Sequence, residues 1–291
     1  MNAEWKRPPL VIDNHGHVGK FEPGDIVDGF DPALSLGGSH EDFLALMDAA
    51  GVDAAVLHTL RPWANQYHRR IIAQHPGRFI SVCKIDETVA HTAQAVERVR
   101  MYVQDWGFKG LYYDPWPPVG TEAAEGFHGP AYAPLWELVQ RLDVPVCFVS
   151  YRQNFATLWP ALLKLLERRP RLRVVIVHGL YPAMLLQAGG KVVIPDDALR
   201  LVKGFDVSLD LLAGHGQDRY GPQDQIIRAL YDAFGPAKLL WGSEFTKVSD
   251  PTARQYACQL HYLENRCRFL TADDLRLILG ANAQRVYGLG T

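Results

Sequence analysis

The sequence is short of cysteine, of long apolar runs and of any surplus charge. Four cysteines occur in 291 residues without a Cys-x-x-Cys pair, so we expect reduced thiols and a cytoplasmic protein rather than a disulfide scaffold. No apolar run reaches the roughly eighteen residues of a membrane-spanning helix, and the N-terminal stretch lacks the apolar region of a secretory signal. The net charge of −2, with scattered lysine and arginine, argues against nucleic-acid or membrane partners. We expect a small-molecule substrate, and the sequence is compatible with either a monomer or a homo-oligomer.

Short β-branched runs alternate with longer stretches of helical period along the chain. This alternation is typical of βαβ units and a parallel sheet. Eight strands are predicted, at residues 10–13, 54–57, 79–83, 110–113, 145–149, 173–177, 206–209 and 238–241. With helices between them and no linker, they predict an α/β fold: one (β/α)8 barrel of the TIM type that forms a single domain over residues 1–291.

Helix signals support this order of elements. Ser39 and Asp42 have the spacing of a capping box, which predicts a helix that ends at Gly51. A second helix is expected over residues 65–74, and Thr271 is expected to cap one of the last helices. The interval 252–266 is predicted to be a single helix.

Two histidines follow the first strand in the segment Asp13-Asn14-His15-Gly16-His17. In an extended backbone, side chains alternate between faces, so His15 and His17 point the same way and could hold one ion between them. The alternative, that both are solvated loop residues, stays open at this point. Asp13 is expected to bond the backbone beneath the pair.

Polar side chains also end the other predicted strands. In a barrel of this type, the chemistry lies at the carboxyl ends of the strands. After the pair of histidines, the residues found there are His58, Lys84, Asp86, Tyr112, Tyr113, Asp114, Ser150, Tyr151, Arg152, Gln153, His178, Asp210, Ser243 and Glu244. Three imidazoles and a carboxylate at one mouth suit a divalent ion such as zinc, manganese or cobalt.

Five short motifs occur in the order that a known family shows. They are Ile12-Asp13-Asn14-His15-Gly16-His17, Gly107-Phe108-Lys109-Gly110-Leu111, Val177-His178-Gly179, Gly242-Ser243-Glu244-Phe245 and Asn282-Ala283-Gln284-Arg285-Val286-Tyr287-Gly288-Leu289. Together they resemble the amidohydrolase-related (amidohydrolase 2) family of the amidohydrolase superfamily, over nearly the whole chain. The resemblance implies a barrel enzyme, typically with one metal ion: a decarboxylase of aromatic acids, a hydratase, or a hydrolase of lactones or amides. Some lactone-opening relatives work without a metal.

Two positions depart from the family pattern. The histidine that many members carry at the end of the fifth strand is Val149 here, and valine cannot bind a metal. The aspartate of the family's Gly-Ser-Asp is Glu244, one methylene longer. Because Lys109 precedes the fourth strand instead of ending it, we expect at most one metal ion.

A hypothesis built on these positions and on the resemblance gives each candidate residue a role. The expected metal ligands are His15, His17, His178 and Glu244, with zinc ahead of manganese and cobalt; metal-free operation stays open. Glu244 and His178 are the expected catalytic residues. The expected substrate contacts are Arg152, Tyr112, Tyr151 and His58, with Arg152 placed to bind a substrate carboxylate.

Several of these residues could instead have a purely structural role. Arg152 could form a salt bridge with a loop carboxylate, and His58 could be a core imidazole. Only one of Tyr112 and Tyr113 can face the barrel axis. His215 and Trp116, on predicted loops, are further candidates to reach the mouth. The remaining helix and loop histidines are expected at the surface; they are His40, His68, His75, His91 and His128.

Three functions follow from this sequence. The first is a metal-dependent hydrolase that opens a small, carboxylated cyclic ester (a lactone) or amide. The second is a lyase, a non-oxidative decarboxylase of an aromatic acid. The third is a non-catalytic barrel with a degenerate metal site, for which Val149 and Glu244 are the support. The identity of the substrate does not follow from the sequence, because loop side chains set it.

Overall fold

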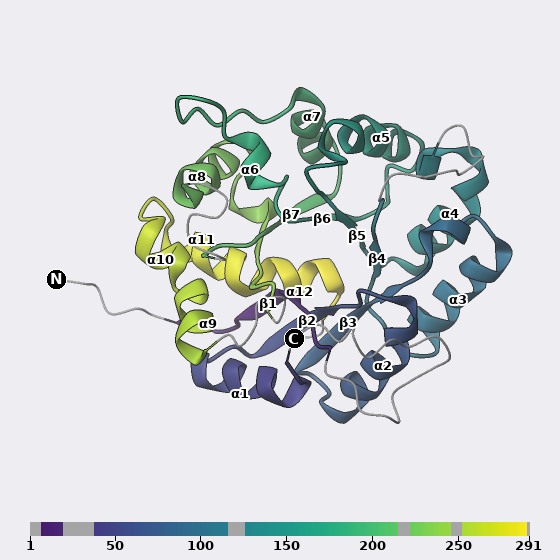
Figure 1. The fold of residues 1–291 in the computed structure, drawn as a ribbon, viewed down its shortest axis with the longest axis horizontal. Coiled ribbons are helices and arrows are strands. Elements are labelled where there is room, and N and C mark those ends of the chain that lie inside the picture. The colour runs from purple at the N-terminus through teal and green to yellow at the C-terminus, as the bar shows by residue number, and fades with distance from the viewer. Residues whose placement is uncertain (1–6, 20–37, 116–125, 215–221, 246–251, 290–291) are drawn as a thin grey trace.

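The computed structural model describes residues 7–19, 38–115, 126–214, 222–245 and 252–289, and Figure 1 shows its fold. Two of the candidates at the mouth, His215 and Trp116, lie outside these residues. Among the described residues, no helix combines the length and the apolar character needed to cross a membrane.

Eight parallel strands pair in sequence order, as predicted. They are β1 (Ile12–Gly16), β2 (Ala54–His58), β3 (Phe79–Lys84), β4 (Leu111–Tyr113), β5 (Val146–Val149), β6 (Val174–Val177), β7 (Val207–Leu211) and β8 (Leu239–Trp241). Strand β1 starts later than predicted and continues through His15, so that histidine belongs to the strand itself. The first and last strands meet beyond β8, where Glu244 N donates to His15 O at 2.8 Å and His17 N donates to Phe245 O at 3.1 Å. The (β/α)8 barrel is thus nearly closed.

Helices surround the ring of strands (Figure 1). They are α1 (His40–Ala50), α2 (Asn65–Gln74), α3 (Ala93–Gln104), α4 (Ala133–Leu142), α5 (Phe155–Arg168), α6 (Pro182–Leu185), α7 (Asp196–Gly204), α8 (Gln223–Phe234), α9 (Ala253–Leu260), α10 (Tyr262–Arg266), α11 (Ala272–Arg276) and α12 (Asn282–Tyr287). The predicted capping box at Ser39 is confirmed, and Thr271 caps α11 as expected. The predicted single helix over residues 252–266 is wrong, because the chain breaks at His261 into α9 and α10.

Alternation along the strands divides the apolar side chains into two cores. The outer core lies between strands and helices, and the inner one fills the barrel with residues such as Ile12, Val82 and Val149. Tyr112 belongs to the inner core and Tyr113 to the outer one, so Tyr112 faces the axis. Helix α12, yellow in Figure 1, contributes to the inner core beside Leu10, which precedes β1. It therefore covers the amino-terminal end of the strands and leaves the carboxyl end for chemistry.

Two histidines expected at the surface are buried. His68 is 1% exposed, and its Nδ1 lies 2.9 Å from Thr59 Oγ1 and 2.8 Å from Ser81 Oγ. His40 packs with Nδ1 at 3.0 Å from the Tyr67 hydroxyl. The prediction of surface positions is wrong for both, because hydroxyl groups on other elements make an apolar helix face acceptable to an imidazole.

Candidate active site

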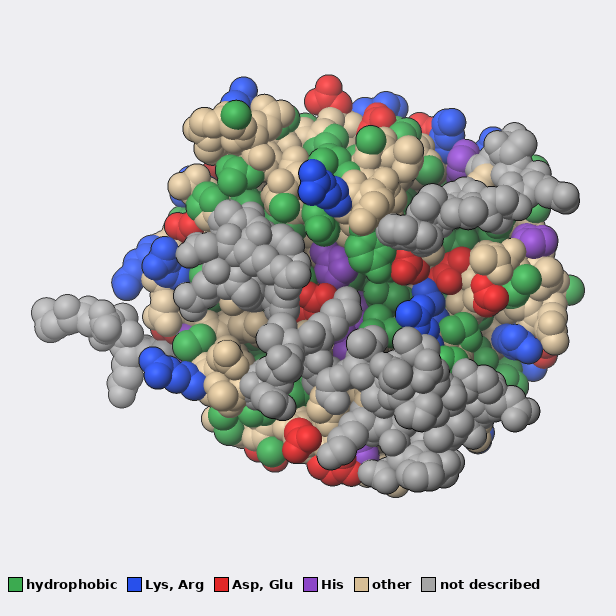
Figure 2. All heavy atoms as spheres, in the orientation of Figure 1, with side chains coloured by type: hydrophobic (Ala, Val, Ile, Leu, Met, Phe, Trp, Pro, Cys, Tyr) green, Lys and Arg blue, Asp and Glu red, His purple; other side chains and the backbone are tan. Residues whose placement is uncertain are grey.

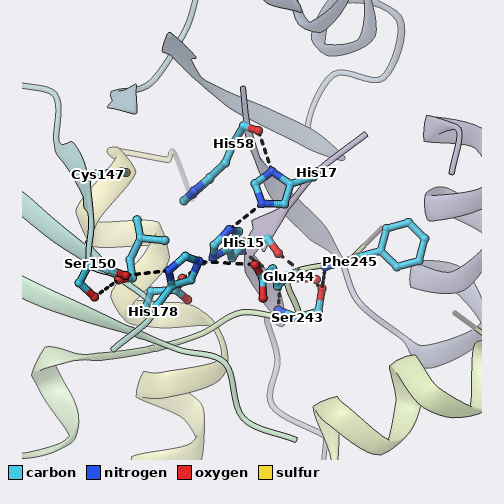
Figure 3. Close-up of polar contacts among 12 residues, drawn as sticks. His15, His17, His58, Cys147, Ser150, His178, Ser243, Glu244 and Phe245 are labelled. Carbon is cyan, nitrogen blue, oxygen red and sulfur yellow. Dashed lines mark hydrogen bonds and ion pairs between the residues drawn. The ribbon is translucent and has the colours of Figure 1, made fainter. Parts of the chain in front are cut away.

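Strand β1 places the two histidines of the His-x-His segment on one side. His15 Nε2 and His17 Nε2 lie 2.9 Å apart and both rings are buried (Figure 3). The other nitrogen of each ring has its own partner: His15 Nδ1 lies 2.6 Å from Asp210 Oδ2, and His17 Nδ1 lies 2.9 Å from His58 O. These outer contacts fix the ring orientations and turn both Nε2 atoms toward one point. The reading of the pair as solvated loop residues is wrong.

Proton positions follow from the acceptors around this pair. The His58 carbonyl oxygen can only accept, so His17 Nδ1 carries a proton and the Nε2 of the neutral ring accepts. His15 Nε2 then donates across the 2.9 Å contact. Burial raises the pKa of Asp210 well above its ordinary value, and Asp210 shares a proton with His15 Nδ1. One proton therefore occupies the gap between the two Nε2 atoms.

His178 and Glu244 form a second pair beside the first. His178 Nε2 lies 3.5 Å from Glu244 Oε1, and His178 Nδ1 lies 3.1 Å from Ser150 O. Both residues have left-handed backbones, with φ of 65° and 53°. Non-glycine residues rarely adopt this conformation, and it concentrates at functional sites. Each side chain leaves its strand at a sharp turn, which aims both groups at the mouth.

Stacked rings join the two pairs. The His15 ring stacks on that of His58, with centroids 4.3 Å apart, and on that of His178 at 5.5 Å. The Tyr112 ring lies 5.3 Å from His58, and the Tyr151 ring lies 5.7 Å from His178. Figure 3 shows the labelled imidazoles converging from different strands. Because burial raises the pKa of Tyr112 well above its ordinary value, its hydroxyl stays protonated.

Asp13 supports the site from below, as expected. Its Oδ1 accepts from His15 N at 3.1 Å and from Ser243 N at 2.9 Å, and its Oδ2 accepts from the Tyr256 hydroxyl at 2.9 Å. Burial raises the pKa of this carboxyl to about 6. The side chain ties β1 to the segment after β8, where the barrel closes.

A cavity of about 990 Å³ opens at the carboxyl ends of β3 and β4 and the loop after β5. Lys84 and Asp114 are among its lining residues, whereas Arg152 is exposed and does not line it. Tyr151 is half-buried and donates from its hydroxyl to Asp114 Oδ2 at 3.1 Å. Of the predicted substrate contacts, the structure thus brings His58, Tyr112 and Tyr151 to the cluster and leaves Arg152 outside it.

Sequence reasoning gave no role to Asp210 or Lys84. Lys84 follows the inward-facing apolar residues Ile80 and Val82 along β3, and Asp210 alternates with the apolar residues of β7, so a charged residue near the end of a predicted strand was the available signal. Asp210 is fully buried against His15, and Lys84 is 4% exposed. Their roles depend on neighbours from distant strands.

The predicted metal ligands divide into two separate pairs. His15 and His17 fit two ligand positions of one ion, since a tetrahedral zinc site needs ligand nitrogens about 3.3 Å apart. His178 and Glu244, by contrast, face each other. In the part of the chain that the structure describes, no three His, Cys, Asp or Glu side chains are placed to share an ion. The side chains as they stand do not fit a complete metal shell, and the four-ligand set stays a prediction.

Known proteins resemble this chain in sequence and in fold. A family model described as amidohydrolase matches residues 12–289. The L-fucono-1,5-lactonase of Burkholderia ambifaria is 29% identical in an alignment 150 residues long. The alignment covers 44% of this chain and 46% of that relative, so this chain spans just under half of its length.

Two solved structures share the fold. A probable 2-pyrone-4,6-dicarboxylic acid hydrolase from Acinetobacter baumannii, with bound citric acid, has a TM-score of 0.67 at 18% identity, over 96% of this chain and 99% of that one. The 5-carboxyvanillate decarboxylase of Novosphingobium aromaticivorans, with bound manganese, has a TM-score of 0.66 at 13% identity, over 96% and 97%.

Proposed function

Because the chain belongs to the amidohydrolase family, we propose that it hydrolyses a small cyclic ester, a lactone, at the imidazole cluster. Family membership makes the chain an enzyme, a hydrolase or a lyase, which sets aside the non-catalytic barrel. One observation carries the proposal: the Glu244 carboxylate faces His178 Nε2 at 3.5 Å, next to the His15–His17 pair. The 29% identity to a lactonase supports the choice of an ester ring.

The Glu244–His178 pair supplies the proton transfers of the reaction. His178 Nδ1 donates to the Ser150 carbonyl oxygen, which leaves its Nε2 to accept a proton from the side of Glu244. Glu244 takes a proton from water as the water oxygen bonds to the lactone carbonyl carbon. The ring C–O bond then breaks, and the pair returns that proton to the departing ring oxygen. The product is one hydroxy acid, whose carboxyl releases a proton to solvent.

Tyr112 is the proposed donor to the carbonyl oxygen of the substrate. Its hydroxyl stays protonated, and its ring contacts His58 inside the mouth. A protonated hydroxyl in a buried site stabilises the negative charge that develops on that oxygen. Arg152, which is exposed, is the weakest of the predicted substrate contacts in this arrangement.

One divalent ion is proposed to bind at His15 and His17, with zinc ahead of manganese and cobalt. The contact of Nε2 atoms at 2.9 Å supports this position, since both rings are already oriented by Asp210 and His58. An ion there would polarise a carbonyl group or a water molecule when bound.

A panel of lactones, lactams and hydroxybenzoates tests the proposal, with proton release and CO₂ release measured in parallel. We expect proton release with lactones and no CO₂. Glu244→Gln should lower kcat by roughly a hundredfold or more, because glutamine cannot accept the proton. Glu97→Gln is the matched control, since Glu97 lies exposed on α3 and pairs with Arg100.

Two outcomes contradict lactone hydrolysis at this pair. CO₂ release from a hydroxybenzoate without any lactone turnover would place the enzyme among the decarboxylases. Equal kcat values for Glu244→Gln and Glu97→Gln with lactones would remove Glu244 from the reaction.

A further inference from the structure

The cavity beside the imidazole cluster contains a buried lysine that the proposed reaction does not use. Lys84 ends β3 and points into the barrel with a side chain only 6% exposed. Its Nζ forms an ion pair with Glu87 and lies 5.0 Å from the centre of the Tyr112 ring. Since an ammonium group carries three protons, the contact with Glu87 leaves donors available to a ligand in the cavity.

Asp114 lies on the same wall of the cavity. Its backbone N donates to Glu87 Oε1 at 2.8 Å, so Glu87 connects it to Lys84. Its Oδ2 accepts from Tyr151, whereas its Oδ1 is buried without a hydrogen-bond partner among the described residues. A buried carboxylate oxygen without a donor costs free energy, and a ligand hydroxyl that reaches Asp114 would offset this cost.

The aromatic rings of two tyrosines lie between this wall and the imidazoles. Tyr112 separates Lys84 from His58, and Tyr151 separates Asp114 from His178. Acidic and basic side chains gather beside the central histidines in Figure 2. The imidazoles are not among the residues that line the cavity, so a ligand that contacts both the cluster and this wall would extend past these two tyrosine rings.

We propose that Lys84 and Asp114 form a hydroxyl-binding subsite, so that the substrate is a neutral lactone with several hydroxyl groups. A hydroxyl both donates and accepts, so it matches an ammonium donor beside a carboxylate acceptor. The inference rests on the proposed lactone hydrolysis and replaces the carboxylated ring expected from Arg152.

The charge of the cavity favours a neutral substrate over an anionic one. Its lining includes two permanent cations, Arg61 and Lys84, against three carboxylates, Asp86, Glu87 and Asp114. A site for a substrate carboxylate needs a cation in excess. Here Lys84 is already neutralised by Glu87, and the acceptor Asp114 would repel a carboxylate.

Binding of a polyhydroxylated δ-lactam tests the subsite without turnover, because the lactam keeps the ring and hydroxyls but resists hydrolysis. Asp114→Asn removes the charged acceptor. The double variant Lys84→Met, Glu87→Gln removes the ammonium without leaving a buried carboxylate unpaired. Calorimetry should show the lactam bound roughly tenfold to a hundredfold more weakly by either variant. The affinity of the unsubstituted δ-lactam should fall less in the same variants.

The matched controls are Lys109→Met and Asp143→Asn, both at exposed positions; Asp143 has a left-handed backbone that asparagine tolerates. The subsite is refuted if the variants weaken both lactams alike, or if a carboxylated lactam binds the wild type more tightly than the hydroxylated one. Lactone opening without a preference for hydroxyl groups also refutes it, while the proposed function stands. Selective loss of lactam binding in a protein that opens no lactone supports the subsite and refutes the proposed function.

Discussion

Gly242 is the position where one added methyl group should disturb the site most directly. A Cβ there would lie 2.5 Å from Asp210 Oδ1 and 2.6 Å from His15 Cβ, where carbon atoms normally keep well beyond 3 Å. His15 Cβ belongs to β1, so it cannot rotate away. Overpacking of this size costs about 1–3 kcal/mol, and a displacement of about 1 Å at a catalytic group costs roughly a hundredfold in rate. Gly242→Ala should therefore lose both stability and activity.

The assay compares Gly242→Ala with Gly204→Ala, a glycine at the end of α7 with nothing within 4 Å of its added Cβ. For a chain of this size, 1–3 kcal/mol corresponds to a Tm lowered by roughly 2–8 °C. Gly204→Ala should leave Tm equal or slightly higher. Thermal unfolding and kcat with a lactone measure both effects. Equal Tm and kcat for Gly242→Ala and the wild type would refute the close packing of Gly242 against His15 and Asp210.

Three further predictions concern the charged groups around the pair. Asp210→Asn should lower kcat roughly 10–100-fold because it weakens the orientation of His15, whereas Asp206→Asn, a half-exposed position before β7, should not. The pKa of Asp13 is raised from 3.8 to about 6, so folding favours the protonated carboxyl. The stability that this protonated carboxyl contributes is present below about pH 4 and is lost as the pH rises through 6. The free energy of unfolding of the wild type should thus fall by roughly 2–3 kcal/mol relative to that of Asp13→Asn between pH 4 and 7.5. The same difference between the two unfolding free energies at both pH values would contradict this. Zinc binding at the pair should release about one proton, from His15 Nε2, in calorimetry across buffers; binding without proton release, or undiminished binding by His15→Asn, would exclude this position.

Local patterns in the sequence were enough to predict much of the fold. Strand and helix periods, together with the capping residues Ser39 and Thr271, depend on near neighbours, and so the barrel and its order of strands could be derived. The alternation of an extended backbone likewise predicted that His15 and His17 share a side.

Contacts between distant strands decided the rest. Closure of β1 onto the segment after β8 brings Asp210 to His15, and the left-handed backbones of His178 and Glu244 turn these side chains toward each other rather than toward the first pair. The burial of Lys84 against Glu87, and the exposure of Arg152 outside the cavity lining, depend on loop paths. The sequence by itself therefore determined which chemical groups stand at the mouth of the barrel. Only the tertiary structure decided which of them touch, because contacts such as His15–Asp210 and His178–Glu244 join residues far apart along the chain, where spacing carries no geometric signal.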